Sequence, residues 1–341
     1  MEKGKKYIPC SYFKQGKNVL HRVILDTDLG DDIDDMWALA FLLRCPEIRL
    51  ELIVTAGHGF HDIRARIAAR LLIEAGGVRG MKIGLGCIND LPQERHMYQE
   101  SWVRNLNLKE WQSSYSGEVI SDGVQALIDI VMSSDDIITV IAIGPMDNIL
   151  EALKREPRIV SRVRFVSMLG SINVGYLGIP IPMPEFNVKV NPKAVRTVLS
   201  AQWIEKIITP LDSCGSVAIS GDVWQAFKAS KDPLAKTLIK AHTAWYNAVP
   251  EKVRAFRRYP DPSNGTTILY DTVAVHLTFS NWLFEIQKLH LQITDDGMTK
   301  AVDSTVSEAL VDVAIRCEDV EAFVSYMVSR LTSGGNYKSK F

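Results

Sequence analysis

Short apolar segments alternate with longer helical segments through most of this 341-residue chain, and this alternation constrains the fold more than any other feature. Residues 22–26 and 49–55 have the composition of buried strands, and each is followed by a segment with a helical pattern, at 36–44 and 62–75. Strands that alternate with helices form a mainly parallel sheet with helices on both faces. Further strands are expected at residues 81–85, 137–143, 163–168, 204–209 and 310–315, and further helices at 118–132, 146–155, from 192, and at 233–248, 271–278 and 319–331.

The sequence therefore predicts a single α/β domain over residues 22–333, with a Rossmann-like, mainly parallel central sheet and helices on both faces. A polar leader (residues 1–21) and a polar tail (residues 334–341) are expected to flank this domain. In parallel sheets of this kind, ligands bind beyond the carboxyl ends of the strands. The residues just after each strand are therefore the first place to look for a functional site.

The composition argues against several classes of function. The formal net charge of −1 does not favour a nucleic-acid-binding surface or a polybasic membrane-binding surface. The basic N-terminus is not followed by an apolar signal-peptide core, and the longest apolar runs are too short to span a membrane. The five cysteines form no Cys-x-x-Cys pair, which favours free thiols over a zinc site or a disulfide framework. We expect a cytoplasmic protein without a nucleic-acid or membrane partner.

The turn after the first strand is strongly acidic, because residues 26–35 (DTDLGDDIDD) contain six aspartates and no Lys or Arg. Helix capping and the helix dipole explain one or two aspartates there, but not six. Like charges ~5 Å apart repel by roughly 3 kcal/mol at an effective dielectric constant near 20. A bound cation would offset this repulsion, and all-oxygen ligands without His or Cys indicate a hard ion, Ca²⁺ or Mg²⁺. Calcium takes ~6–8 oxygens, so distant parts of the chain should supply further ligands.

The segment VILDTDLGDDIDDMWALAFLL (residues 23–43) resembles the N-terminal signature of the nucleoside hydrolase family, which includes the inosine-uridine-preferring enzymes. In that signature a strand ends in Asp-x-Asp, and a Gly and an Asp-Asp pair precede an apolar helix. Its plainest form is two residues shorter. We take Asp34 and Asp35 as the matching pair, and the alternative register that uses Asp31 and Asp32 stays open. The resemblance continues in order to about residue 331, through residues 52–87, IGPMDN (143–148), residues 156–170, EFN (185–187) and YD (270–271).

This resemblance implies a calcium-dependent N-ribohydrolase, which hydrolyses the N-glycosidic bond of a ribonucleoside to free base and ribose. Asp28, Asp35, Asp271 and the main-chain carbonyl of Ile143 would bind Ca²⁺. Asp28 would also be the general base that takes a proton from a water held by the ion. Asp26 would support the turn, and the assembly would be a homodimer or homotetramer. The residues that would contact the ribose are Asp34, Met168, Glu185 and Asn187. For Glu185 and Asn187, the alternative is a polar loop that caps the next helix.

Two ribose contacts of the family are absent from this sequence. An Asn after the second strand corresponds to Gly59, and an Asn six residues before the Glu of Glu-Phe-Asn corresponds to Ile179. Each lost hydrogen bond would cost ~1 kcal/mol or more of recognition. Either the sugar differs, or neighbouring residues such as His58, His61 or Asn173 make the contacts instead.

Leaving-group activation also departs from the family pattern. Some members have a His before the C-terminal metal-binding Asp, but this chain has Tyr270, whose reference pKa near ~10 makes it a weaker acid at neutral pH. Tyr270 is therefore expected to stack on the base, or a histidine elsewhere in the chain acts as the acid. His242 shares a helix face with Trp245 and Tyr246, which makes it a candidate base contact, and an amphipathic helix with a buried aromatic edge is the alternative. The basic segment 249–259 is expected to be a solvated face, with a phosphate-bearing substrate as its alternative.

Two other functions stay open. Asp26-x-Asp28 after a first strand also resembles the nucleophile pair of haloacid dehalogenase-like phosphohydrolases, although Leu29-Gly30 fits that motif poorly. A non-catalytic nucleoside- or sugar-binding protein that kept the fold and the ion is the second alternative. Only the losses at Gly59 and Ile179 favour it, whereas the expected metal ligands are retained.

Overall fold

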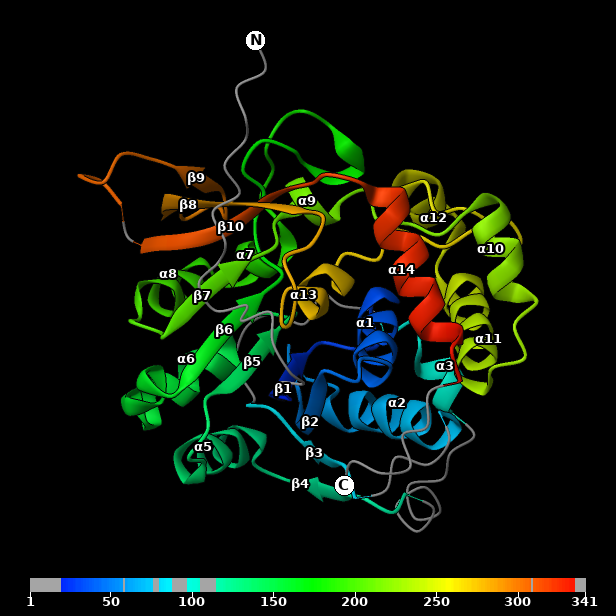
Figure 1. Cartoon of the computed structure of the whole chain (residues 1–341), viewed down its shortest axis with the longest axis horizontal. Coiled ribbons are helices and arrows are strands. Elements are labelled where there is room, and N and C mark those ends of the chain that lie inside the picture. The colour runs from blue at the N-terminus through cyan, green and yellow to red at the C-terminus, as the bar shows by residue number, and fades with distance from the viewer. Residues whose placement is uncertain are drawn as a thin grey trace.

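A 10-stranded sheet forms the centre of the molecule (Figure 1). The structure is a computed structural model, which describes residues 20–57, 59–75, 80–87, 97–104, 115–307 and 309–334. Neighbouring strands pair in parallel except at β8 and β9, which pair antiparallel at one end of the sheet. In spatial order the strands are β4 (Glu118–Ile120), β3 (Lys82–Gly84), β2 (Ile48–Thr55), β1 (His21–Thr27), β5 (Ile138–Ala142), β6 (Val163–Ser167), β7 (Glu205–Ile208), β10 (Ala309–Cys317), β8 (Phe284–Ile293) and β9 (Thr299–Ala301).

Helices cover both faces of this sheet, which confirms the predicted α/β fold with a mainly parallel sheet. Alternate residues of β1 enter two different cores: Val23 and Leu25 pack in one, and Ile24 packs in the other. The first core includes residues of α1 (Asp34–Leu43), α2 (His61–Glu74), α10 (Gly221–Lys228), α11 (Pro233–Ala248), α13 (Thr272–His276) and α14 (Val320–Thr332), and the second includes residues of α5 (Gly123–Ser133), α6 (Asp147–Arg155) and α8 (Pro192–Ser200). The shorter helices are α3 (Glu100–Val103), α7 (Phe186–Val190), α9 (Leu211–Cys214) and α12 (Glu251–Arg257), with 3-10 turns at Pro157–Ser161 and Tyr176–Gly178.

Some elements differ from the sequence prediction. Residues 118–132 were expected to be one helix, but β4 takes the first residues and α5 begins at Gly123. The cause is Asp122, whose side chain accepts from the main-chain N–H of Gln125 and so caps α5 there. The hairpin of β8 and β9 and helices α10 and α12 were not predicted. The predicted domain boundaries stay predictions, since residues 1–19 and 335–341 lie outside the described residues.

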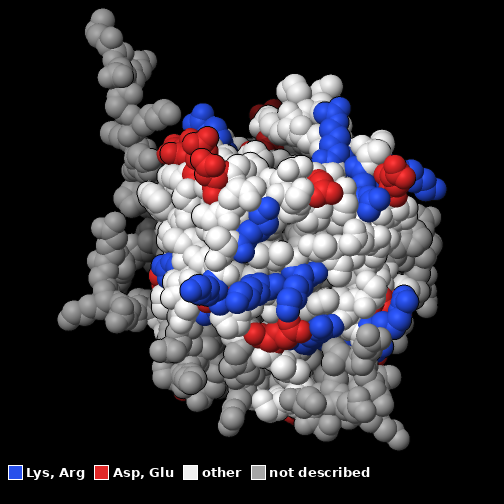
Figure 2. All heavy atoms as spheres, turned by 90° about the vertical axis from the view of Figure 1, so that its right-hand side faces the viewer, with Lys and Arg blue, Asp and Glu red and all other residues white. Residues whose placement is uncertain are grey.

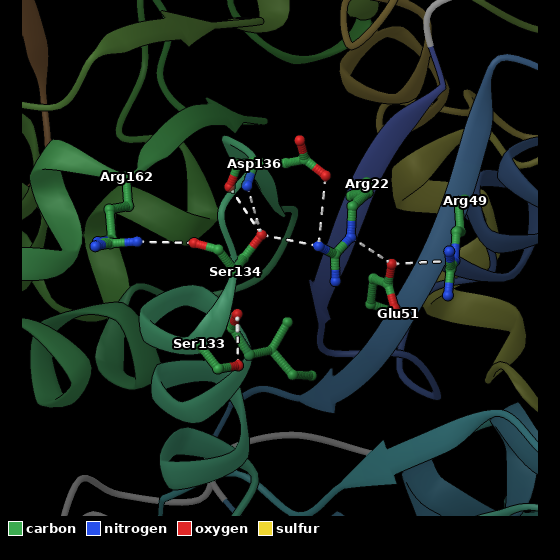
Figure 3. Close-up of polar contacts among 8 residues, drawn as sticks. Arg22, Arg49, Glu51, Ser133, Ser134, Asp136 and Arg162 are labelled. Atoms are coloured by element: carbon green, nitrogen blue, oxygen red, sulfur yellow. Dashed lines mark hydrogen bonds and ion pairs between the residues drawn. The ribbon is translucent and has the colours of Figure 1, made fainter.

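Polar side chains join the strands β1, β2, β5 and β6 near their amino ends (Figure 3). Arg22 donates to Glu51 Oε1 at 2.7 Å and to Ser134 Oγ at 2.8 Å. Arg162 donates to the main-chain carbonyl of Ser134 at 2.7 Å. These ion pairs and hydrogen bonds lie near the amino ends of the parallel strands and have a structural role. The acidic turn, in contrast, follows the carboxyl end of β1, at the opposite ends of the strands.

Among the described residues, each helix is too short or too polar to cross a lipid bilayer.

Candidate active site

Three carboxylates meet at the carboxyl edge of the sheet. Asp34 and Asp35 are the first residues of α1, and Asp271 lies immediately before α13. One carboxylate oxygen from each lies within 4.8 Å of the others, and all three residues are buried. Thr27, the last residue of β1, donates its hydroxyl to Asp35 Oδ1 at 2.5 Å. The strand end therefore fixes one member of the group directly.

Burial and mutual repulsion raise the pKa of each of these carboxyls. For Asp34, Asp35 and Asp271, burial is the largest cause, and neighbouring carboxylates add to it. Their ionised forms are therefore costly unless a cation lies among them. The donors are all oxygens, which is the chemistry that Ca²⁺ and Mg²⁺ prefer. The residues present thus fit a hard divalent cation.

Asp28 lies beside the strand end of β5. A Cβ atom at position 144 would come within 3.0 Å of both the main-chain nitrogen and Oδ1 of Asp28, so Gly144 allows this close approach. Asp28 is 5% exposed. Its carboxylate is therefore next to the residue that follows Ile143, whose carbonyl was an expected metal ligand. Asp28 is not one of the three carboxylates that form the compact group.

Asn187 joins the segments that follow β5 and β6. Its side-chain amide donates to the main-chain carbonyl of Ile143 at 3.1 Å and to that of Met168 at 3.2 Å. Asn187 and Met168 are both buried. Three residues that the sequence analysis placed in one site are thus in direct contact.

Glu185 caps the short helix α7. Its carboxylate accepts from the main-chain N–H groups of Asn187 at 2.9 Å and of Gly170 at 3.0 Å. These contacts are the ones that the capping alternative predicts, and the ribose contact stays a prediction. After burial, the charges of Asp271 and Glu185 are the largest causes that raise the pKa of the Cys214 thiol. Glu185 therefore lies on the same side of the molecule as the acidic group.

The other aspartates of the turn have separate partners. Asp32 Oδ2 accepts from the hydroxyl of Tyr259 at 3.1 Å, and its main-chain carbonyl accepts from Gln99. The main-chain carbonyl of Asp31 accepts from the indole N–H of Trp245 at 2.9 Å. The extra residues of the turn thus attach it to the segment at Gln99, to α11 and to the segment after α12. The register that pairs Asp34 with Asp35 agrees with these positions.

Asp26 lies beneath the turn and is fully buried. Its Oδ2 accepts from the side-chain amide of Asn148 at 2.7 Å. Its Oδ1 has no hydrogen-bond partner among the described residues. Burial raises the pKa of Asp26 to about 7. These contacts are those of a residue that supports the turn, as the resemblance implies.

Tyr270 and Tyr176 form an aromatic pair beside Asp271. Their ring centroids lie 6.0 Å apart with an edge-to-face geometry, and Tyr270 is partly exposed. Burial is the main cause that raises the pKa of Tyr270, so its hydroxyl remains a poor acid. The guanidinium of Arg257, on α12, lies 5.3 Å from the Tyr176 ring centroid. The pair is therefore in position to offer an aromatic surface close to Asp271.

His242 lies inside an aromatic cluster between α1 and α11. Its Nδ1 accepts from the indole N–H of Trp37 at 3.3 Å, and its ring contacts those of Trp224 and Trp245. The side chain is 1% exposed, and burial lowers its pKa to about 3. These are the surroundings that the packing alternative describes. A contact between His242 and a base stays a prediction.

The basic segment 249–259 contains α12, next to α11. Figure 2 shows Lys and Arg side chains gathered in a band across the face of the molecule that carries α10, α11 and α14. Arg254 lies over the Tyr246 ring and donates to its main-chain carbonyl at 2.8 Å. Among the described residues, no ion pair with Asp or Glu involves Arg257 or Arg258. Residues 255–258 are exposed, as the expected solvated face requires, whereas Tyr259 contacts the acidic turn through Asp32.

Comparison with known proteins decides the family. The family model for inosine-uridine preferring nucleoside hydrolase matches residues 23–325. This chain belongs to the nucleoside hydrolase family. An inosine-uridine preferring nucleoside hydrolase of Leishmania major is 32% identical over 189 residues, which cover 53% of this chain and 58% of that protein. The aligned part is thus less than two thirds of that relative.

Two further similarities cover more of the chain. A non-specific ribonucleoside hydrolase of Salmonella agona is 27% identical over 289 residues, which cover 83% of this chain and 87% of that protein. The solved structure of a purine-preferring ribonucleoside hydrolase from Gardnerella vaginalis matches with a TM-score of 0.71 at 20% identity, covering 92% of this chain and 98% of that one. The similarity to this solved structure, at 20% identity, shows a shared fold.

The two positions where this chain lacks an expected Asn lie in different surroundings. Gly59 precedes α2 and has a positive φ of 77°, and Ile179 is 38% exposed. Of the proposed substitutes, His61 is hydrogen-bonded to Thr55 at 2.9 Å, and Asn173 donates to Asp212. His58 lies outside the described residues. The replacement of these ribose contacts stays a prediction.

Arg64 is the residue at this site that the sequence analysis missed. It lies in the first turns of α2, is fully buried, and donates to the main-chain carbonyls of Asp28 and Leu29. Its partners are main-chain atoms far away along the chain, so no sequence pattern indicates them. The only available signal was the need of the acidic turn for a positive charge.

Proposed function

We propose that this chain hydrolyses the N-glycosidic bond of a ribonucleoside, releasing the free base and ribose, with the help of calcium. The observation that carries this proposal is the buried group of Asp34, Asp35 and Asp271 in a chain of the nucleoside hydrolase family. A structural role alone does not account for three buried carboxylates in contact, because their repulsion destabilises the fold.

We infer that Asp28, Asp35, Asp271 and the main-chain carbonyl of Ile143 hold the ion. Bound Ca²⁺ would act as a Lewis acid, which lowers the pKa of water and attracts sugar hydroxyls. The donor set, all oxygen and largely buried, supports this assignment. Asp34 lies beside the proposed ion ligands Asp35 and Asp271, which supports a contact with a ribose held at the ion.

The protein residues then have separate roles. Asp28 takes a proton from the attacking water, which forms a bond to C1′ while the bond from C1′ to the base nitrogen breaks. The sugar ring becomes positively charged as this bond breaks, and the carboxylates stabilise that charge. Asp34, Met168, Glu185 and Asn187 hold the ribose. Tyr270 packs against the departing base, which takes its proton from water or from an acid of the site.

A nucleoside panel tests the proposal. The protein, stripped with a chelator and then supplied with CaCl₂ or buffer alone, is incubated with inosine, guanosine, adenosine, uridine and cytidine, and separately with their 5′-monophosphates. Ribose, free base, phosphate and nucleoside binding are measured. We expect ribose and base in equal amounts, only with calcium. Phosphate release from nucleoside monophosphates without ribose would support the phosphohydrolase alternative. Binding of nucleosides without any product would support the non-catalytic alternative, and either result would contradict the proposal.

We also propose a homodimer or homotetramer in the cytoplasm. The support for this assembly is the resemblance to the family alone. Light scattering of the purified protein tests it, and a monomer at micromolar concentration would contradict it.

A further inference from the structure

A buried arginine on α2, Arg64, donates hydrogen bonds to the main chain of the acidic turn. Arg64 is fully buried, and one guanidinium nitrogen, Nη1, donates to the main-chain carbonyls of both Asp28 and Leu29, the second at 2.9 Å. Its Nε donates to the carbonyl of Gly59 at 3.4 Å. The two residues that follow β1 are thus attached to α2 by one side chain.

The backbone around Arg64 is shaped to let it reach Asp28. Gly57 has a positive φ of 88°, and a Cβ atom there would lie 3.3 Å from both Arg64 Nη2 and Asp28 Cβ. A side chain at position 57 would therefore press on both residues. Arg64 Nη2 itself has no hydrogen-bond partner among the described residues. Arg64 and Asp28 thus lie on the same side of Gly57.

Burying a guanidinium is costly unless nearby negative charge offsets the loss of water. Burial is the largest cause acting on the pKa of Arg64 and lowers it, whereas the charges of Asp35 and Asp31 act in the opposite direction and favour the charged form. A side chain that served only to fill the space between α2 and the turn would be apolar at a lower cost. The charge and the hydrogen bonds of Arg64 therefore point to a need to fix the turn in one conformation.

We propose that Arg64 is a positioning residue for the hydrolysis proposed above: its guanidinium fixes the main chain of Asp28 and Leu29, and so fixes where the Asp28 carboxylate points. This inference rests on the proposed function for its effect on catalysis. The effect on the turn is independent of it. Displacement of a catalytic group by ~1 Å costs on the order of 100-fold in rate, so the contact matters to the rate even though Arg64 touches no substrate.

The test compares Arg64→Met and Arg64→Lys with Arg44→Met. Arg44 is another mostly buried arginine, in an ion pair with Asp232 at 2.7 Å at the far end of α1, so its loss matches the cost of removing a buried cation. Two quantities are measured: kcat and KM with calcium, and amide hydrogen exchange of residues 26–35 in the metal-free protein. The hydrogen-exchange measurement depends neither on activity nor on the ion.

We expect Arg64→Met to lower kcat about 100-fold while KM changes less than about threefold, because the ribose contacts remain. Exchange in the turn should become faster. Arg64→Lys keeps the charge but not the guanidinium geometry, so we expect a loss smaller than that of Arg64→Met, and this variant carries the test if Arg64→Met does not fold. Arg44→Met should keep both kcat and the exchange rates of the turn.

Normal kcat and unchanged exchange in the Arg64 variants would overturn the inference, as would equal losses in Arg44→Met. If the unmodified protein releases no ribose from any nucleoside, the proposed function fails. The exchange rates then decide by themselves whether Arg64 fixes the turn.

Discussion

Asp28 is not among the three clustered carboxylates, and we propose it both as an ion ligand and as the residue that takes the proton from the water. It lies against Gly144, with its main-chain carbonyl held by Arg64. Asp28→Ala should lower kcat at least ~100-fold, since general bases contribute ~10²–10⁴ in rate. The melting temperature of the metal-free protein should change little. Asp136→Ala, an exposed carboxylate at the opposite edge of the strands (Figure 3), is the control. A near-native rate in Asp28→Ala would remove the general-base assignment.

Tyr270 is the position where leaving-group chemistry departs from the family. Its ring contacts Tyr176 and its hydroxyl is a poor acid, so the role that we propose for it is an aromatic surface against the base. Tyr270→Ala should therefore change the ratio of kcat/KM between purine and pyrimidine nucleosides, by roughly 5-fold or more on the scale of aromatic stacking. Tyr270→Phe should keep the ratio within about twofold. An equal loss on every nucleoside in Tyr270→Ala would contradict a contact with the base.

Single residues of the site could be predicted where the type and clustering of their side chains indicate a particular chemistry. The crowded aspartates indicated a hard cation, and Asp34, Asp35 and Asp271 do meet in the structure. Arg64 was not predictable, because it binds main-chain oxygens that every residue carries. Glu185 was predicted to contact ribose from the resemblance, and its capping of α7 shows that one carboxylate has a structural partner as well.

At the scale of elements, α11 packs against α1 through a titratable residue. The pKa of His242 is lowered to about 3 by burial, whereas its ordinary value is 6.5. Below pH 6.5 the unfolded chain therefore takes up a proton that the folded protein does not accept until about pH 3. The free energy of unfolding should fall as pH decreases through this window, by roughly 1.4 kcal/mol per unit from this group.

His242→Gln tests this contribution, because Gln can accept from Trp37 but does not titrate. Urea denaturation at pH 6.5 and 5.0 should show a smaller loss of stability in the variant than in the unmodified protein. The difference between the two slopes isolates His242 from other titrating groups. Equal slopes would mean that His242 is protonated in the folded protein, or that it is not buried.

Helices and strands were predicted correctly where one hydrophobic periodicity dominates the segment. They were missed where the sequence of the segment carries conflicting signals. Asn191 and Pro192 marked the start of α8 correctly, and the Asn191 side chain accepts from the N–H of Ala194. The strand β8 (FEIQKLHLQI) mixes buried and partly exposed residues in an irregular order, so it has no clean alternation. Helix α12 was not predicted, because its sequence is basic and is flanked by prolines. Neither of these segments supplies an acidic residue to the site.

At the scale of the molecule, the site joins segments from both halves of the chain, so an ion there should stabilise the whole fold. A ligand at 100 times its dissociation constant adds about 2.7 kcal/mol to the free energy of unfolding. Removing calcium with a chelator should therefore lower the melting temperature by about 5 °C. Added CaCl₂ should restore it. An unchanged melting temperature in chelator would count against an ion that joins α1 to α13.

Calcium binding itself tests the central claim most directly. Isothermal titration calorimetry on the chelator-stripped protein should show one Ca²⁺ per chain, and Asp271→Asn should weaken this binding by at least about 10-fold, since it removes one charged ligand. Asp136→Asn should bind as the unmodified protein does. If the unmodified protein shows no calcium binding, or if Asp271→Asn binds with unchanged affinity, then Asp28, Asp35 and Asp271 do not hold an ion.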